Sequence, residues 1–208
     1  MAATKKIDYK RELRELYGPP RDPVLVEVPE MSFLMIDGQG DPNTAADFTH
    51  AIEALYTVAY TTKFAVKRSD PAADFSVMPL EGLFWTPDSA TFEAGEKAGW
   101  AWTLMIMQPD SVTRETYEHS CEEAARKKSL EAIGRMRLER YAEGLSAQLM
   151  HVGPYAEEGP TIERLQAFIA EQGCEVSGRH HEIYLGDPRR TAPERLRTVI
   201  RMPVRRVG

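Results

Sequence analysis

Two glutamates lie in segments that favour β-strands, where a charged side chain needs an explanation. Glu182 begins "EIYLGDP", and Glu81 begins the similar segment "EGLFWTP". A carboxylate within a strand lies either on a solvated face or in a site. If both carboxylates face one groove lined by aromatic side chains, we expect one to act as an ionised general base and the other as a protonated general acid.

Short sequence matches place the two glutamates in corresponding positions of an internal repeat. "MIDG" at 35–38 parallels "MHVG" at 150–153, "AIEAL" at 51–55 parallels "TIERL" at 161–165, and "IMQP" at 106–109 parallels "IRMP" at 200–203. With the two glutamate segments, these are four matches in the same order, which indicates a duplicated strand-helix-strand-strand unit. We therefore expect an α+β fold, in which the duplicated unit forms one antiparallel sheet with helices on one face and a ligand groove on the other.

The predicted organisation is a single domain over residues 1–208. It comprises an N-terminal extension (1–30), a first repeat (31–110), a linking helix (111–142) and a second repeat (143–208). The linking segment has a helical pattern to about Tyr141, with a break or kink expected near residues 128–130. Further helices are expected at about 45–67 and 159–173.

Side-chain alternation predicts which residues of the strands line the groove. Ile183 suits the helix-covered face, so Glu182 and Tyr184 are expected on the open face. In the first repeat, the same argument leaves Glu81 and Trp85 on the open face. Further candidates for the lining are Trp100 and Trp102 on one face of the next strand, Met105 on its other face, and Tyr117 at the start of the linking helix.

Composition argues against several other classes of function. The net charge is −6, whereas binding of nucleic acid or of an anionic membrane surface favours a basic face. The N-terminus has no apolar signal-peptide core, and no stretch reaches the roughly 18 apolar residues of a membrane span, so a cytoplasmic protein is expected. Cys121 and Cys174 are isolated, and the histidines lack ligand spacing, so neither a metal nor a cofactor is expected. The oligomeric state is left open.

The sequence resembles the GyrI-like small-molecule-binding domains, which also occur as effector-binding domains of multidrug-responsive regulators. The segments "HVGPYAEEG", "HEIYLGDP" and "RTVIRMPV" carry the resemblance most specifically. It implies that Glu182 lies at the floor of a ligand groove with Tyr155 nearby. It also implies that Glu81 and Trp85 occupy the mirrored positions, and that the partners are planar aromatic small molecules.

The N-terminal segment "KRELRELYGPPRDP" is similar to that of a stand-alone subfamily, the cyclopropanoid cyclopropyl hydrolases. This resemblance implies a cofactor-independent, detoxifying hydrolase that opens cyclopropane-bearing alkylating natural products of the yatakemycin and duocarmycin class. Glu182 would assist the addition of water, and Tyr155 would donate a hydrogen bond. Two alternatives remain: a non-catalytic module that binds or sequesters planar aromatic or cationic drugs, and an interaction protein like the gyrase inhibitors. Glu182 could also simply be solvated or pair with Arg179 or Arg197.

Overall fold

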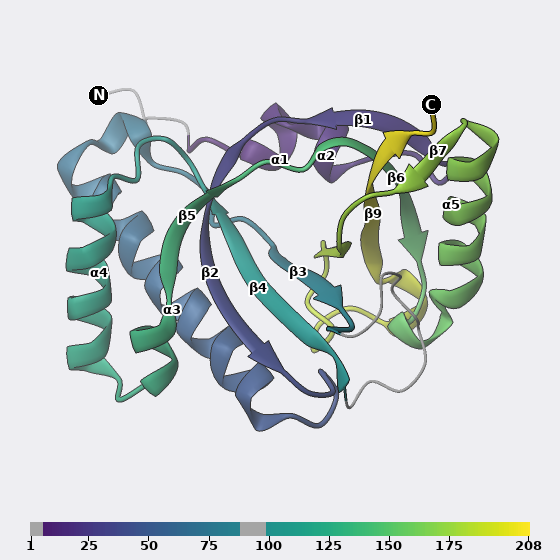
Figure 1. Cartoon of the computed structure of the whole chain (residues 1–208). Helices are drawn as coiled ribbons and strands as arrows, with labels where there is room; N and C mark the ends of the chain where they lie inside the picture. The colour runs from purple at the N-terminus through teal and green to yellow at the C-terminus, as the bar shows by residue number, and fades with distance from the viewer. Residues whose placement is uncertain (1–5, 88–98) are drawn as a thin grey trace.

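The computed structural model describes residues 6–87 and 99–208, and its centre is one nine-stranded antiparallel sheet (Figure 1). The strand order is β1-β6-β9-β8-β3-β4-β2-β5, with the short β7 paired to β9. The strands are β1 (Val24–Val28), β2 (Met31–Gln39), β3 (Leu80–Trp85), β4 (Ala101–Gln108), β5 (Arg137–Tyr141), β6 (Gly144–Val152), β7 (Cys174–Val176), β8 (His180–Tyr184) and β9 (Arg197–Arg206). No helix in this described part is long and apolar enough to cross a membrane.

The order of the strands confirms the α+β fold and the duplication. The first repeat contributes β2, β4 and β3 to one half of the sheet, and the second contributes β6, β9 and β8 to the other half. The two halves meet where β3 pairs with β8. The strands β6, β9 and β8, counted inwards from one end, correspond to β2, β4 and β3, counted inwards from the other end. The outer strands β1 and β5 extend the two ends.

The two repeat helices, α3 (Ala46–Ser69) and α5 (Gly159–Glu171), pack on the same face of the sheet. On α3, Phe48 contacts Trp102 of β4 edge to face, with 5.1 Å between ring centroids. On α5, Leu165 lies in a core cluster with Ile200 of β9. The register of the strands places Trp102 and Ile200 on one face, because residues directly opposite in an antiparallel ladder point the same way. We call this face the helix face.

The linking segment is only partly helical, which corrects the prediction of a helix to Tyr141. Helix α4 (Arg114–Lys127) begins after the capping residue Thr113 and lies against α3 (Figure 1). The predicted break near 128–130 is present, but a 3-10 turn (Glu131–Arg135) and strand β5 follow it. Three of the five residues of "RLERY" are charged, which hid this short strand.

The opposite face of the sheet is also partly covered. Two short helices, α1 (Tyr9–Glu12) and α2 (Arg14–Tyr17), precede β1. Leu16 and Tyr17 are buried in the same cluster as Ile183 and Val199 of the second repeat. The N-terminal extension therefore covers part of the face opposite α3 and α5, and its buried residues belong to the same hydrophobic cluster as those of α3. Burial alone consequently does not reveal the face on which a strand residue lies.

Candidate functional site

The structure places Glu81 and Glu182 on opposite faces of the sheet, which corrects the prediction of a shared groove. In the β3–β8 ladder, Glu182 lies opposite Gly82, and Glu81 lies opposite Ile183. Glu182 therefore belongs to the helix face and Glu81 to the other face. The prediction placed Ile183 towards the helices, but Ile183 lies opposite Glu81, on the face where Tyr17 of the N-terminal extension contacts Glu81.

A one-residue offset between the repeats explains this error. Glu81 and Glu182 both precede a similar motif, so the sequence comparison treated them as equivalent. The ladders instead make Glu81 the counterpart of Ile183. The matched residues Met35 and Met150 lie opposite Met105 and Val199, and these two lie opposite Glu81 and Ile183. In a strand, an offset of one residue moves a side chain to the other face.

Glu182 is held in place by two neighbours on its own strand. His180 Nε2 lies 2.9 Å from Glu182 Oε1, and the Tyr184 hydroxyl donates to Glu182 Oε2 at 2.8 Å. All three side chains are on the helix face because they alternate along β8. The Glu182 side chain is 12% exposed, while that of His180 is fully buried. A carboxylate with a fixed orientation thus remains accessible to a small molecule.

Tyr155 joins Glu182 from the turn that precedes α5, in the 3-10 helix Tyr155–Glu157. Its ring contacts Tyr184 edge to face, with centroids 5.4 Å apart, and 37% of the residue is exposed. Burial, together with the carboxylates of Glu158 and Glu182, raises the pKa of Tyr155 to about 12. Burial and Glu182 also raise the pKa of Tyr184 well above its ordinary value. Both hydroxyls are therefore hydrogen-bond donors at neutral pH.

Helix α3 adds two tyrosines that the sequence analysis missed. Tyr56 lies beside the backbone of Leu80, which lies opposite Tyr184 in the ladder. The rings of Tyr56 and Tyr60 are stacked, with centroids 6.4 Å apart, and Tyr60 is 51% exposed. An aromatic pair at i and i+4 of a predicted helix was the available signal. We call His180, Glu182, Tyr184, Tyr155 and Tyr56 the Glu182 cluster.

Glu81, in contrast, belongs to a buried network of charges on the other face. Its carboxylate accepts a hydrogen bond from the Tyr17 hydroxyl at 2.8 Å and lies 3.1 Å from His181 Nε2. His181 Nδ1 lies 2.9 Å from Glu143, which also accepts a hydrogen bond from Arg201 at 2.9 Å. Glu81 has no exposed surface. It therefore cannot contact a ligand directly in this structure.

The pKa values of His181 and Glu143 are consistent with an imidazolium paired with a carboxylate. Burial alone lowers the pKa of His181, but the Glu143 carboxylate and hydrogen bonds to Glu143 and Glu81 raise it to about 8. Burial alone raises the pKa of Glu143, but His181 and Arg201 lower it to about 2. Both ring nitrogens of His181 lie beside carboxylates, as expected for an imidazolium that donates twice.

The same network holds the N-terminal extension on the sheet. The Arg201 guanidinium donates to the Leu16 carbonyl at 2.8 Å and to the Gln148 side chain at 3.0 Å. Gln148 in turn donates to the Glu15 carbonyl at 2.7 Å. These contacts give the network a structural role, because its bonds link the extension to strands of both repeats.

Four other predicted lining residues lie inside the protein. Trp102 and Met105 have no exposed surface, so neither offers a contact to a ligand. Trp100 is 5% exposed and lies 5.8 Å from Phe84, measured between ring centroids. Tyr117 is 7% exposed and donates its hydroxyl to the Met136 carbonyl, away from the Glu182 cluster.

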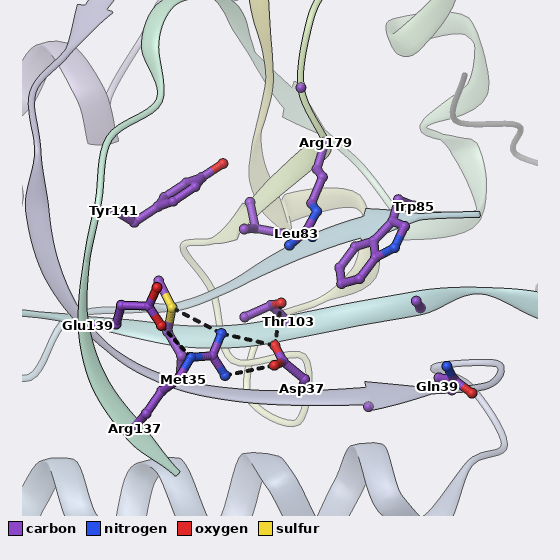
Figure 2. A pocket seen from close by; sticks show the side chains of 13 residues that line it. Met35, Asp37, Gln39, Leu83, Trp85, Thr103, Arg137, Glu139, Tyr141 and Arg179 are labelled. Atoms are coloured by element: carbon purple, nitrogen blue, oxygen red, sulfur yellow. Dashed lines mark hydrogen bonds and ion pairs between the residues drawn. The ribbon is translucent and has the colours of Figure 1, made fainter. Parts of the chain in front are cut away.

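Trp85 lies on the face opposite Glu182, where it lines a separate cavity. The cavity has a volume of about 680 Å³ and lies over β2, β3, β4 and β5 (Figure 2). The Arg179 guanidinium lies over the Trp85 ring, 3.6 Å from its centroid. Trp85 and Glu182 therefore do not contribute to one site. In the described ranges, no group of three or more histidine, cysteine or acidic side chains could hold a metal ion.

A model of the GyrI-like small-molecule-binding domain matches residues 21–205. The chain belongs to this family. An uncharacterised conserved protein from Listeria innocua is 41% identical, with a TM-score of 0.89 over 96% of this chain and 100% of that one. A hydrolase from Listeria innocua is 39% identical, with a TM-score of 0.83 over the same shares.

The C-terminal domain of EcmrR shares the fold, with a TM-score of 0.54 and 14% identity over 89% of this chain and 98% of that domain. A search of curated proteins found no match. The GyrI-like family and the general fold were thus predicted correctly from the sequence.

Proposed function

We propose that this GyrI-like protein is a hydrolase that opens cyclopropane-bearing alkylating compounds at the Glu182 cluster. The observation that supports this most directly is the partly exposed Glu182 carboxylate, oriented by His180 and Tyr184 and flanked by Tyr155. Family membership supports small-molecule binding, and the 39% identity to a protein described as a hydrolase supports hydrolysis. The class of compound follows the resemblance to the cyclopropanoid cyclopropyl hydrolases.

In the proposed reaction, Glu182 acts as a general base towards a water molecule. The water oxygen attacks the cyclopropane methylene and forms a C–O bond, while its proton passes to the carboxylate. The strained C–C bond breaks, and its electron pair moves through the conjugated dienone to the carbonyl oxygen. Tyr155 donates a hydrogen bond to that oxygen as negative charge develops. Transfer of the proton to the resulting phenolate completes a net addition of water.

The neighbours of Glu182 support this role through the orientation that they give the carboxylate. His180 and Tyr184 each contact one of its oxygens, and 12% of the side chain is exposed. The tyrosine rings would contact the flat ring system of the substrate, each pair contributing about 0.5–1.5 kcal/mol beyond burial of area.

The test is to incubate the protein with a cyclopropane-bearing compound of the duocarmycin class and follow product masses. We expect a product heavier by one water, and we expect Glu182→Gln to bind the compound but to form product at least about a hundredfold more slowly. Glu194→Gln, an exposed residue before β9, is the control and should match the unchanged protein. Product formation by Glu182→Gln at the normal rate would contradict the role of Glu182.

The second candidate is a module that binds small molecules without turning them over. The observation that favours it is the combination of several tyrosines with one carboxylate in the Glu182 cluster. Such a site suits a planar cation, since aromatic faces and a carboxylate both attract positive charge. The expected result would then be saturable binding of a cationic dye, weakened by Glu182→Gln, with no change in the mass of any bound compound. Formation of a hydrated product would show that the protein does more than bind the compound.

A further inference from the structure

The cavity on the opposite face has the size and lining of a site of its own. Its volume of about 680 Å³ lies within the range of small-molecule pockets, roughly 300–1,000 Å³. It is separated from the Glu182 cluster by the sheet itself: Leu83 lines the cavity, while the preceding residue, Gly82, lies opposite Glu182 on the helix face. A molecule in one site therefore does not contact a molecule in the other.

One half of this cavity holds two carboxylates that share one guanidinium. Arg137 pairs with Asp37, at 2.8 Å from one nitrogen and 3.1 Å from another, and also pairs with Glu139. The Thr103 hydroxyl donates to Asp37 at 2.7 Å. Figure 2 shows these contacts side by side on the floor of the cavity. Both carboxylates are thus already engaged with Arg137, and the three groups together carry one negative charge.

The other half carries a positive charge without a carboxylate partner among the described residues. Arg179 enters from the segment before β8 and places its guanidinium over Trp85 at 3.6 Å. No ion pair joins Arg179 to an acidic side chain in residues 6–87 and 99–208. Stacking of a guanidinium on an indole leaves its edge donors available, because the contact uses only the flat face.

Apolar and aromatic side chains surround that charge. Leu83 lies between Trp85 and Tyr141, Met35 lies below Tyr141 beside Arg137, and the Tyr141 hydroxyl points into the cavity towards Arg179 (Figure 2). Burial and the nearby Glu143 carboxylate raise the pKa of Tyr141 to about 12, so its hydroxyl is a neutral donor at physiological pH. The lining thus combines a flat apolar wall with two donors at one end.

We propose that this cavity is a second small-molecule site, which takes a planar aromatic carboxylate. The carboxylate would accept two hydrogen bonds from the edge of the Arg179 guanidinium, the geometry in which arginine binds this group best. The aromatic body would lie along Trp85 and Leu83, with the Tyr141 hydroxyl at the same end as the guanidinium. An amine of the same shape could not accept a hydrogen bond from Arg179, and its positive charge would be repelled by that group.

The test uses three probes of equal shape: 2-naphthoate, its neutral amide, and 2-naphthylmethylamine. Binding is measured by isothermal titration calorimetry. We expect 2-naphthoate to bind most tightly and Arg179→Met to weaken it at least about tenfold, the loss of one charged hydrogen bond. Binding of the amide should change little in the same variant. Arg195→Met, an exposed arginine before β9, is the matched control and should leave all three affinities unchanged.

Two further variants separate this site from the Glu182 cluster. Glu182→Gln should leave the affinity for 2-naphthoate unchanged, and Arg179→Met should leave turnover of a cyclopropane substrate unchanged. Trp85→Leu should weaken the acid and the amide alike, because it removes the flat wall and not the charge. Equal affinity for acid and amide, absence of saturable binding, or loss of binding in Glu182→Gln alone would each overturn the proposal.

Discussion

The buried network around His181 predicts a specific response to Glu143→Gln. This change keeps the shape of the side chain but removes the carboxylate that lies 2.9 Å from both His181 and Arg201. The side chains of His181 and Arg201 are each 1% exposed, so water cannot replace the lost anion. Breaking a buried ion pair by removing one partner costs about 3–5 kcal/mol. We expect the free energy of unfolding to fall by that amount.

The same network should make the free energy of unfolding depend on pH. In the unchanged protein, the folded pKa of His181 is raised from 6.5 to about 8. Its contribution is therefore fully present below pH 6.5 and is lost as the pH rises through 8, a loss of about 2 kcal/mol. The pKa of Glu143 is lowered to about 2, so the same contact is also lost as the pH falls from 4.5 towards 2. Stability should be greatest between these limits.

Urea unfolding at pH 6 and pH 9 measures both effects, provided that the slope of the transition is unchanged. Glu53→Gln is the control, since it breaks an exposed ion pair with Lys128 and should cost less than about 1 kcal/mol. A loss below about 1 kcal/mol in Glu143→Gln would refute the reasoning. If that variant does not fold, the decrease between pH 6 and pH 9 in the unchanged protein is the deciding measurement, and a flat profile would count against the network.

Three further changes test other parts of the structure. Gly38→Ala would place a Cβ 2.1 Å from the Trp102 ring, so thermal unfolding should show a loss of at least about 1–3 kcal/mol. Asp74→Asn would leave the buried Lys63 ammonium, now 2.8 Å from a carboxylate, without its anion; denaturant unfolding should show a loss of about 3 kcal/mol. Tyr155→Phe should bind a cyclopropane substrate within a few-fold of normal but form product about a hundredfold more slowly in mass-resolved kinetics; an unchanged rate would remove the hydroxyl from the mechanism.

The duplication was predictable because each matched motif lies in a regular element. The four matches locate β2, α3, β3 and β4 with their counterparts, and the strand order follows the same two-fold scheme. β5 was not predictable in the same way. Three of its five residues are charged, it follows a helical segment, and only its pairing with β2 identifies it as a strand.

The site was predicted in part, and the reason lies in the register of β3 against β8. Glu182, Tyr184 and Tyr155 were identified from the sequence, and the structure brings them together. The assignment of Glu81 failed because motif matching has an uncertainty of one residue, and in a strand one residue decides the face. Tyr56 was missed because the pattern of α3 was read for its buried stripe and not for the aromatic side chains beside it.

The pairing of Gly82 with Glu182 gives an almost symmetric backbone an asymmetric set of side chains. Where the two halves meet, the second repeat contributes the carboxylate of Glu182. The first repeat contributes Gly82, whose side chain is a single hydrogen atom. A ligand that is itself two-fold symmetric would not bind more tightly because it matches the symmetry of the backbone, since only one of its two ends can approach the carboxylate. The two halves of the duplicated sheet thus differ chemically at the site, and a compound that binds there should adopt one orientation.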